Sequence, residues 1–487
     1  MALVVALERA LPPLLPAGRA TAVFCTGVCF DATRRIERLE IIVDGTAHAA
    51  SAFGMPRPDV AAAYAGSAAA RASRHSGFWA TVPIAGRAAP GEIVVQVAAR
   101  LADGSSEIAE LGRIEVVAPA PSAPVRARPA RPGDELIAVC MATFEPRLDL
   151  LDAQMESLRA QTDEHWICLV SDDGSSVQRF EQIVALIGGD PRFEVSRSPQ
   201  RQGFYRNFER ALQLVPVDAP LVALSDQDDR WHPDKLRTLR GAIGAAGLVY
   251  SDQRLVDTNG AVLRETLWRG RRNNHDDLTS MLVANTITGA ATLFRRELLD
   301  LLLPFPDTPG FQFHDAWLGA AALAAGDVAY VDRPLYDYVQ HADAVFGDVT
   351  HGPTRGRRRR DRSLAAPRAA YFHGYLGREA QARVLLTRCG PQLTSSKRRA
   401  LERLVACDRS PGALAWLALR AMRCLTGRSE TLGSELGLAR GVAWKLTTSW
   451  LARRAAALTE RGPFADASIP APERFNQKRL RRWRARI

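Results

Sequence analysis

A short acidic segment that follows an apolar run constrains the fold of this sequence more than any other feature. The run 220–224 predicts a buried strand, and Ser225-Asp-Gln-Asp-Asp-Arg-Trp231 follows it directly. Sheets of α/β proteins place their ligands just past the carboxyl ends of their strands. The segment therefore predicts an α/β sheet with a ligand site at this edge, and an acidic surface loop is the alternative.

The spacing of the carboxylates predicts a cation at this edge. In an extended backbone Asp226 and Asp228 point to the same side. Two carboxylates about 4 Å apart repel by roughly 4 kcal/mol at an effective dielectric of about 20, and a divalent cation turns that repulsion into attraction. Oxygen ligands favour Mg²⁺ or Mn²⁺, and a protein-bound Mg²⁺ commonly also holds phosphate oxygens.

Residues 1–118 have a different pattern, which predicts an all-β accessory domain. Short alternating or apolar runs are separated by turn signals such as Asp44-Gly45 and Asp103-Gly104, a pattern typical of a small Ig-like sandwich. These runs are 21–28, 39–43, 77–83, 92–99 and 112–117. Residues 119–134 are rich in Pro, Ala and Arg and predict a linker.

Strands and helices alternate from residue 135 onward. Apolar runs at 136–143, 166–171 and 193–198 predict strands, and the segments between them carry apolar residues at helical spacing. Such alternation predicts a Rossmann-like, mostly parallel sheet with helices on both faces. We expect this domain to span residues 135–347.

The charge of the chain is unevenly distributed over its 487 residues. From residue 351 onward, 30 Lys and Arg face 9 Asp and Glu, whereas the first 350 residues hold 34 against 44. Residues 348–363 predict a basic linker, and residues 364–487 predict a helical basic region. A basic helix with an apolar side can bind a membrane surface, and a solvated helix bundle with a disordered tail is the alternative.

Other sequence features predict the compartment. No run of 18 or more uncharged apolar residues occurs, and the amino-terminal segment lacks the basic start of a secretory signal. The seven cysteines show no zinc spacing, which indicates buried thiols in a reducing compartment. We therefore expect a cytoplasmic protein, peripheral at the inner face of the plasma membrane if its basic end binds lipid headgroups.

Several motifs together resemble family 2 glycosyltransferases. Val139-Cys-Met-Ala-Thr-Phe-Glu145, Val170-Ser-Asp-Asp-Gly-Ser-Ser176 and the acidic segment have the order and spacing seen in that family. The acidic segment with Pro233 and Lys235 is similar to the rhamnosyltransferase-like branch. Further matches are Thr288-Gly-Ala290, His314-Asp-Ala-Trp-Leu318 and Tyr336-Asp-Tyr-Val-Gln-His341.

This resemblance implies a GT-A fold and an inverting transfer. The donor would be a nucleotide sugar such as dTDP-rhamnose or a UDP-sugar. The acceptor would be a glycan or a polyprenyl-linked glycan of surface polysaccharide synthesis. It implies Mg²⁺ or Mn²⁺ as the cofactor. Nucleic acid is not an expected partner, because the basic run lacks interleaved aromatic residues except near Trp483.

The resemblance also implies roles for single residues. The metal site would comprise Asp228, Asp226 and His341, and Asp315 would be the general base, with a helix N-cap as its alternative role. Glu145 stands where the family usually has Asn, so that contact departs from the family pattern. The residues expected at the donor nucleotide are Thr143, Glu145, Asp172, Asp173, Gly203, Asn207 and Asp226. The residues expected at the sugar or the acceptor are Asp229, Trp231, Gly289, Ala290, His314 and Trp317.

Other interpretations remain open at this stage. Asp172 begins good turn chemistry, and large aromatic residues after strands are more often core than sugar platforms. A non-catalytic carbohydrate-binding protein with a degenerate transferase domain would keep the same fold. A sugar nucleotidylyltransferase would also pair carboxylates, yet no Gly-rich basic loop follows the first strand of the α/β domain.

Overall fold

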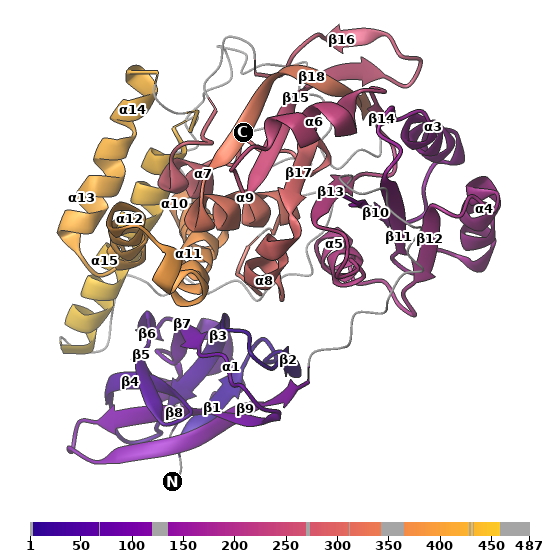
Figure 1. Ribbon diagram of the computed structural model, residues 1–487. Helices are drawn as coiled ribbons and strands as arrows, with labels where there is room; N and C mark the ends of the chain where they lie inside the picture. The colour runs from indigo at the N-terminus through magenta and orange to yellow at the C-terminus, as the bar shows by residue number, and fades with distance from the viewer. Residues whose placement is uncertain are drawn as a thin grey trace.

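The computed structural model describes residues 3–67, 69–118, 135–268, 273–310, 312–341, 365–427, 430–431 and 433–457. The predicted linkers at 119–134 and 348–363, and the basic tail after residue 457, lie outside the described residues. The described parts form a β-sandwich, an α/β domain and a helical region, arranged as Figure 1 shows.

The amino-terminal domain consists of two facing sheets, with short helices α1 (Pro58–Ala63) and α2 (Ala70–Ser73) beside them. One sheet has the order β1 (Val4–Leu7), β3 (Thr21–Phe30), β7 (Gly77–Ile84) and β6 (Ala52–Met55). The other has the order β2 (Leu14–Pro16), β9 (Ser106–Val117), β8 (Gly91–Leu101), β4 (Ile36–Val43) and β5 (Thr46–Ala49).

The alternating pattern of these strands explains the sandwich. In β8 the side chains of Ile93, Val95 and Val97 are buried, and the residues between them are more exposed. A strand turns successive side chains to opposite faces, so this alternation gives each sheet one apolar face. The two apolar faces bury each other, with Ile41 and Phe78 fully buried between them.

The α/β domain is built on one large sheet. Along the sheet the order is β12 (Phe193–Arg197), β11 (Trp166–Asp172), β10 (Ile137–Thr143), β13 (Leu221–Ser225), β17 (Thr292–Arg295), β15 (Leu248–Asp257), β18 (Val328–Gln340) and β14 (Arg230–Trp231). A further strand, β16 (Val262–Arg264), pairs with β15. The helices are α3 (Leu148–Arg159), α4 (Val177–Ile187), α5 (Phe204–Gln213), α6 (Lys235–Ala242), α7 (Leu278–Val283), α8 (Leu299–Leu302) and α9 (His314–Ala325), with 3₁₀ turns η1 (Gly289–Ala291) and η2 (Arg296–Leu298).

The first part of this sheet is parallel, as predicted. Strands β12, β11, β10 and β13 all run in the same direction, and α3, α4 and α5 connect them. Every residue of β13 is buried, as expected for a strand covered on both faces. The register pairs Thr143 with Asp172 and Met141 with Ser225, so the carboxyl ends of β10, β11 and β13 meet at one edge.

In the rest of the sheet β15 and β18 share the direction of the first four strands, as predicted for a mostly parallel sheet, and antiparallel strands lie among them. Strand β17 runs antiparallel to both β13 and β15, and β14 runs antiparallel to β18. Strand β18 runs parallel to β15 and crosses the sheet toward the acidic segment. The acidic segment therefore has the end of β18 as its neighbour, a contact that strand–helix alternation in the sequence does not reveal.

The helical region packs against both other domains. It comprises α10 (Ala365–Ala369), the π-helical segment η3 (Ala370–Tyr375), α11 (Leu376–Arg388), the 3₁₀ turn η4 (Gly390–Gln392), α12 (Ser395–Ala406), α13 (Pro411–Arg420), α14 (Met422–Leu425) and α15 (Ser434–Ala457). Trp79 Nε1 of the sandwich donates to Tyr371 Oη at 3.2 Å. The Arg388 guanidinium donates to the carbonyl of Ala20 in the sandwich and, at 2.7 Å, to that of Leu301 in the α/β domain.

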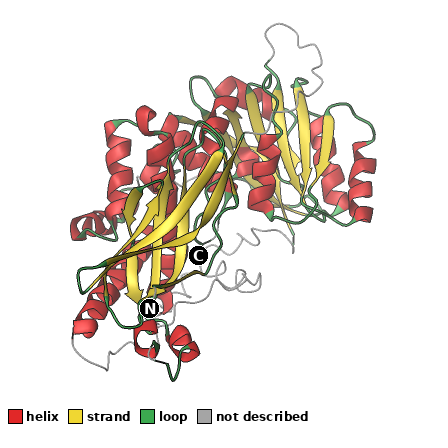
Figure 2. Cartoon of the chain, turned by 90° about the horizontal axis from the view of Figure 1, so that it is seen from below, coloured by secondary structure: helices red, strands yellow, loops and turns green. Residues whose placement is uncertain are grey.

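The three parts therefore contact one another across several surfaces. Figure 2 shows the strands of the sandwich and those of the large sheet as two separate groups with helices beside both. Among the helices in the described ranges, none combines the length and the apolar character needed to cross a bilayer. The six cysteines whose side chains are described are all buried thiols without a disulfide partner.

Candidate active site

The acidic segment, residues 225–231, begins where β13 ends. Asp226, Gln227 and Asp228 are partly exposed, whereas Asp229 is buried. The Gln227 side-chain oxygen accepts from the backbone N–H of Phe144 at 2.8 Å. This bond ties the acidic segment to the loop after β10, so Gln227 sets the distance between two strand ends. Sequence reasoning did not single out Gln227.

Asp226 and Asp315 come from distant parts of the chain and lie in the same site. Burial and, to a smaller extent, the negative charges of Asp228 and Asp315 together raise the pKa of Asp226 to about 7, while Lys235 opposes them. These charge effects act only over short separations, because intervening solvent and salt screen longer ones. The charges of Asp228 and Asp315 therefore both act on Asp226, so the three carboxylates lie in one neighbourhood.

Asp315 lies in the first turn of α9. Helix α9 begins at His314 after the N-cap residue Phe313, so the alternative role of Asp315 as the N-cap is wrong. Its carboxylate accepts from the backbone N–H of Ala316 at 2.6 Å, and the N–H of Gly289 also faces it. Burial raises the pKa of Asp315 to about 7 against the opposing effect of these N–H groups. A carboxyl group with such a pKa can exchange a proton near neutral pH.

Asp228 is paired with a histidine from the end of β18. The His341 Nε2 atom lies 2.8 Å from Asp228 Oδ2. The His341 side chain is 7% exposed and that of Asp228 is 22% exposed, so the carboxylate remains accessible. This contact places His341, the residue just after β18, against the acidic segment.

Asp229 lies beneath the segment and not at its surface. It is 1% exposed, and its Oδ1 atom faces the backbone N–H of Val339 in β18 at 3.4 Å. Burial raises the pKa of this carboxyl well above its usual range, with added effects from Asp228 and Asp226. Our assignment of Asp229 to the sugar is therefore corrected: its contact with β18 positions the loop.

Lys235 supplies a buried positive charge next to these acids. Its side chain is fully buried, and Nζ donates to the carbonyl of Ala290. The ammonium lies 3.4 Å from the centre of the Trp231 ring and 4.6 Å from that of Tyr336. Burial lowers the pKa of Lys235, and Asp229 and Asp226 oppose that effect. The sequence analysis used Lys235 only as part of a motif, and no local pattern in the sequence marked its charge as buried.

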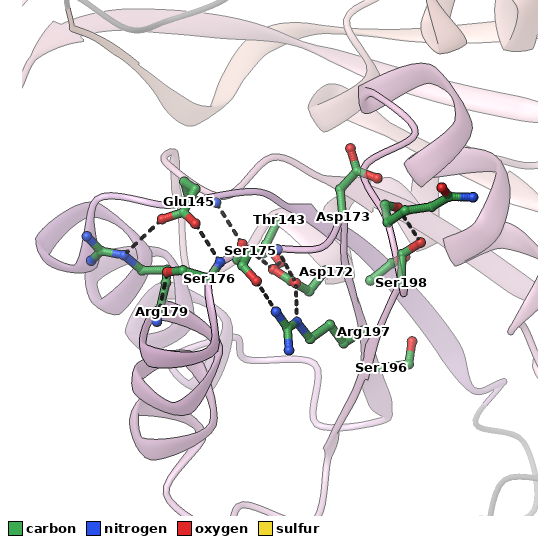
Figure 3. A network of polar contacts seen from close by, with 12 residues as sticks. Thr143, Glu145, Asp172, Asp173, Ser175, Ser176, Arg179, Ser196, Arg197 and Ser198 are labelled. Atoms are coloured by element: carbon green, nitrogen blue, oxygen red, sulfur yellow. Dashed lines mark hydrogen bonds and ion pairs between the residues drawn. The ribbon is translucent and has the colours of Figure 1, made fainter.

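The edge expected to bind the nucleotide contains a dense network of hydrogen bonds (Figure 3). The Asp172 carboxylate accepts from the backbone N–H and the hydroxyl of Ser175, at 2.9 and 2.6 Å, and from the Thr143 hydroxyl at 3.3 Å. Glu145 has a positive φ of 42°, and its carboxylate accepts from Ser176 N–H at 2.6 Å. The turn that we considered as an alternative for Asp172 is therefore present in the structure.

Asp173 holds the start of α5. Its two carboxylate oxygens accept from the backbone N–H groups of Gln202 and Gly203, at 2.7 and 2.8 Å. Gly203 is the N-cap of α5 and has a φ of 90°, a conformation that L side chains rarely adopt. Asn207, also expected at the nucleotide, is instead buried: its amide donates to the carbonyls of Thr143 and Ser171. Asn207 therefore joins β10 to β11, which corrects its predicted role.

Three residues expected at the sugar or the acceptor lie in the core. Trp231 is 3% exposed, Ala290 is 1% exposed, and Trp317 is fully buried with its indole N–H on the Leu302 carbonyl at 3.0 Å. None of these side chains offers a surface for stacking on a sugar, so these assignments are corrected. Trp231 lies in β14, Ala290 in the turn η1 and Trp317 in α9, and each of the three side chains belongs to the main core cluster.

His314 and Gly289 pack against each other beside Asp315. The His314 ring stacks on Phe208, with ring centres 3.7 Å apart, and burial lowers its pKa to about 3. A Cβ atom added at Gly289 would lie 2.4 Å from His314 Nε2, so the close approach requires glycine. This packing fixes the segment whose N–H group faces the Asp315 carboxylate.

The residues present fit a divalent ion that is bound largely by a substrate. In the described ranges, no three His, Cys, Asp or Glu side chains converge as a preformed metal centre. Asp228 and His341 nevertheless place an oxygen and a nitrogen 2.8 Å apart at an accessible position. Mg²⁺ commonly takes one or two protein carboxylates and completes its shell with water and phosphate oxygens.

Solved structures with detectable similarity to this chain have low sequence identity. S. aureus TarS 1-349 in complex with UDP-GlcNAc is 15% identical, with a TM-score of 0.40, and the match covers 66% of this chain and 92% of TarS 1-349. A mannosyltransferase from Pyrobaculum calidifontis in complex with GDP-Man and Mn²⁺ is 17% identical, with a TM-score of 0.35, covering 66% and 90%. No curated protein matches the sequence.

A family model matches part of the α/β domain. The matched residues, 138–303, include the acidic segment and the Asp172 edge and end before Asp315. The mixed sheet with its helices is the GT-A type of fold that we predicted. The model that residues 138–303 match is that of glycosyl transferase family 2.

Proposed function

We propose that this protein is an inverting glycosyltransferase. It transfers a sugar from a nucleoside-diphosphate sugar to a hydroxyl group of a glycan or of a lipid-linked acceptor. The observation that carries the proposal is the convergence of Asp226, Asp228 and Asp315, because a metal-binding pair and a base are what a single displacement needs. The family match of residues 138–303 supports the same reaction class.

Asp315 is the proposed general base. Its raised pKa of about 7 means that an ionised fraction is present at neutral pH and that this carboxylate is a better proton acceptor than an ordinary Asp. The acceptor oxygen forms a bond to the anomeric carbon while the bond from that carbon to the diphosphate breaks. The hydroxyl proton passes to Asp315, and the nucleoside diphosphate leaves from the opposite face, so the configuration inverts.

Asp228 and His341 are the proposed protein ligands of a Mg²⁺ or Mn²⁺ ion, with Asp226 beside them. When bound, such an ion neutralises charge that develops on a diphosphate leaving group. Lys235, buried close to Asp226 and Asp229, offsets part of their negative charge when it is protonated. The loops after β10 and β11 are the proposed walls of the nucleotide pocket.

The finer details of the proposal come from the sequence. The acidic segment with Pro233 and Lys235 is similar to the rhamnosyltransferase-like branch, which favours dTDP-rhamnose or a UDP-sugar as the donor. The basic carboxyl-terminal region favours anionic headgroups at the cytoplasmic face of a membrane, where a lipid-linked acceptor for surface polysaccharide would be found.

The test is a panel of nucleotide sugars assayed for metal-dependent release of nucleoside diphosphate, with Asp228→Ala and Asp315→Asn as matched variants. A transferase releases diphosphate from one donor, and both variants lose that release. Binding without turnover across the panel would support the non-catalytic alternative. Pyrophosphate release from a nucleoside triphosphate and a sugar phosphate would support a nucleotidylyltransferase instead.

The membrane proposal is tested separately. Helices α11 and α15 pack on the other domains, so the informative deletion is the tail alone, after residue 457. The full chain is expected to sediment with vesicles that contain anionic lipid and to dissociate at high salt. Equal sedimentation of the chain without residues 458–487 would contradict a role for the tail.

A further inference from the structure

A cavity of about 610 Å³ lies between the sandwich and the α/β domain. Strand β2 and the segment before it form one wall, and α5 with the segment around Phe305 forms the other; Figure 1 shows β2 and α5 on the facing sides of the two domains. None of the carboxylates of the acidic segment lines it. Its volume is within the range of small-molecule sites, about 300–1,000 Å³.

The walls of this cavity are held in place by contacts between the two domains. Asp307 forms an ion pair with Arg9 and a β-bridge with Val23, and both partners belong to the sandwich. Arg19 of the sandwich is ion-paired to Asp300 at 2.8 Å. These contacts lie around the cavity, so both domains are needed to form it.

The wall on the α/β domain is polar and carries two arginines, Arg206 and Arg210. Gln202, Arg206, Arg210 and Gln213 recur at helical spacing and present one side of α5 to the cavity. Arg206 is anchored through Nη1 to the Phe305 carbonyl at 3.0 Å. The Nη1 atom of Arg210 donates to the Ser171 hydroxyl at 2.7 Å. A guanidinium has five N–H donors, so anchoring by one nitrogen leaves donors for an anion.

The acids of the cavity are already engaged. Glu209 accepts from the Phe305 backbone N–H at 2.7 Å and from Arg206, and Asp307 accepts from Arg9. Arg9, Arg206 and Arg210 outnumber these two carboxylates among the lining residues. An anionic group is therefore favoured in the cavity over a cationic one.

The wall on the sandwich is apolar. It is formed mainly by Ala10, by the leucines and prolines of residues 11–16, and by Ala22 and Val23. Leu14 is 51% exposed, so part of this apolar wall is open to solvent. A ligand that fills the cavity would bury this surface, and each buried CH₂ group contributes about 0.8 kcal/mol.

We propose that this cavity binds an amphiphilic anion, with its phosphate on Arg206 and Arg210 and its apolar chain on β2. Given the proposed function, from which this identification follows, the ligand is the prenyl phosphate part of a lipid-linked acceptor. Helix α5 starts at Gly203, which Asp173 holds at the nucleotide edge, and is about 15 Å long. A ligand along α5 thus lies within one helix length of the site where the donor is proposed to bind.

The test measures binding to the full chain without a donor, using farnesyl phosphate, farnesol and inorganic phosphate as probes. Farnesyl phosphate is expected to bind more tightly than either of the others, because only it matches both walls. Leu14→Asp and Gln213→Glu place a negative charge in the cavity at exposed positions, and each is expected to weaken binding about tenfold or more. Gln178→Glu, the same change at an exposed position of α4, is the control and should bind as the wild type does.

The outcomes separate this proposal from the proposed function. Farnesol or phosphate binding as tightly as farnesyl phosphate would overturn it, as would unchanged binding in both cavity variants or no binding at all. Unfolding temperatures of the variants are measured alongside, and Arg206→Lys, which keeps the charge, is expected to retain most of the binding. Binding of farnesyl phosphate by a chain that turns over no nucleotide sugar would leave the cavity site standing and reject the transferase.

Discussion

Two groups of acids lie at the same edge of the sheet, and the fold surrounds them differently. Asp172 and Asp173 accept hydrogen bonds from Ser175, Gln202 and Gly203, so backbone N–H groups and hydroxyls surround their charges. Asp226 and Asp315 are desolvated enough that the pKa of each is raised to about 7. The chain itself stabilises the anions of Asp172 and Asp173, whereas it stabilises the anions of Asp226 and Asp315 poorly.

This difference indicates a division of labour. Carboxylates whose hydrogen bonds are complete hold the loops after β11 and before α5 in position, as Figure 3 shows for Asp172. Carboxylates that are costly to ionise become more stable when a cation or an acidic hydroxyl arrives, and such groups concentrate at functional sites. The comparison predicts that variants of the second group lose activity, and that variants of the first lose stability.

The largest effect is expected from Asp315→Asn. Asparagine keeps the size of the side chain and an oxygen that can accept from Ala316 N–H, but it cannot take a proton. We expect kcat to fall by ~10²–10⁴-fold with little change in the KM for the donor, since a general base contributes about this much. Steady-state kinetics with the donor found in the panel measure it, and wild-type kcat in this variant would remove Asp315 from the mechanism.

Asp228→Ala is expected to have the next largest effect. It removes the accessible carboxylate and its partner contact with His341 while leaving Asp226 in place. Loss of one charge-stabilising group costs about 10²–10³-fold in kcat, and the variant should need more Mn²⁺ to reach half of its own maximal rate. Titration of the rate with Mn²⁺ measures this; His341→Gln is expected to shift the same curve less, and a metal-independent rate in the wild type would contradict the site.

Much of the fold followed from local patterns in the sequence. The alternation of 93–97 and the apolar run 220–224 determine which faces are buried, and both became the predicted strands. The antiparallel pairing of β17 and the path of β18 were not predicted, because those contacts join segments far apart in the chain.

The sequence predicted which residues belong to the candidate site better than it predicted what each of them does. Asp226, Asp228 and Asp315 were identified, and the charges of Asp228 and Asp315 both act on Asp226. The core alternative for Trp231 and Trp317 was foreseen and is the one that the structure has, whereas the burial of Asn207 was not, since it depends on contacts with strands far away in the chain. Lys235 and Gln227 were missed for the same reason: their roles arise from contacts with Ala290 and Phe144.

The pH dependence of the rate sharpens the comparison. A base with a pKa of about 7 is protonated below that pH, so kcat should fall about tenfold per pH unit on the acid side of 7 and level off above it. Asp315→Glu is the matched variant: it keeps an acid but moves it, and its profile should retain an acid limb at a different position. A flat profile between pH 5 and pH 8, with chemistry limiting the rate, would contradict a raised pKa at the base.

The smallest effects are expected in stability, where the two groups of acids should respond in opposite directions. Asp172→Ala leaves the buried Ser175 and Thr143 donors without their acceptor and should lower the free energy of unfolding by about 1–3 kcal/mol. Asp226→Asn removes a desolvated charge and should leave the free energy of unfolding unchanged or higher above pH 7.

The sign of this second effect follows from proton binding. With a pKa of about 7 in the folded chain and an ordinary lower value when unfolded, Asp226 binds more protons in the folded state between about pH 4 and pH 7. Its contribution to stability is therefore greatest at low pH and is lost as the pH rises through 7, and Asp226→Asn should flatten that slope. Urea unfolding of both variants at pH 5 and pH 8, without divalent cations, measures the contrast; an Asp226→Asn variant that is less stable at both pH values would show that Asp226 belongs with the structural acids.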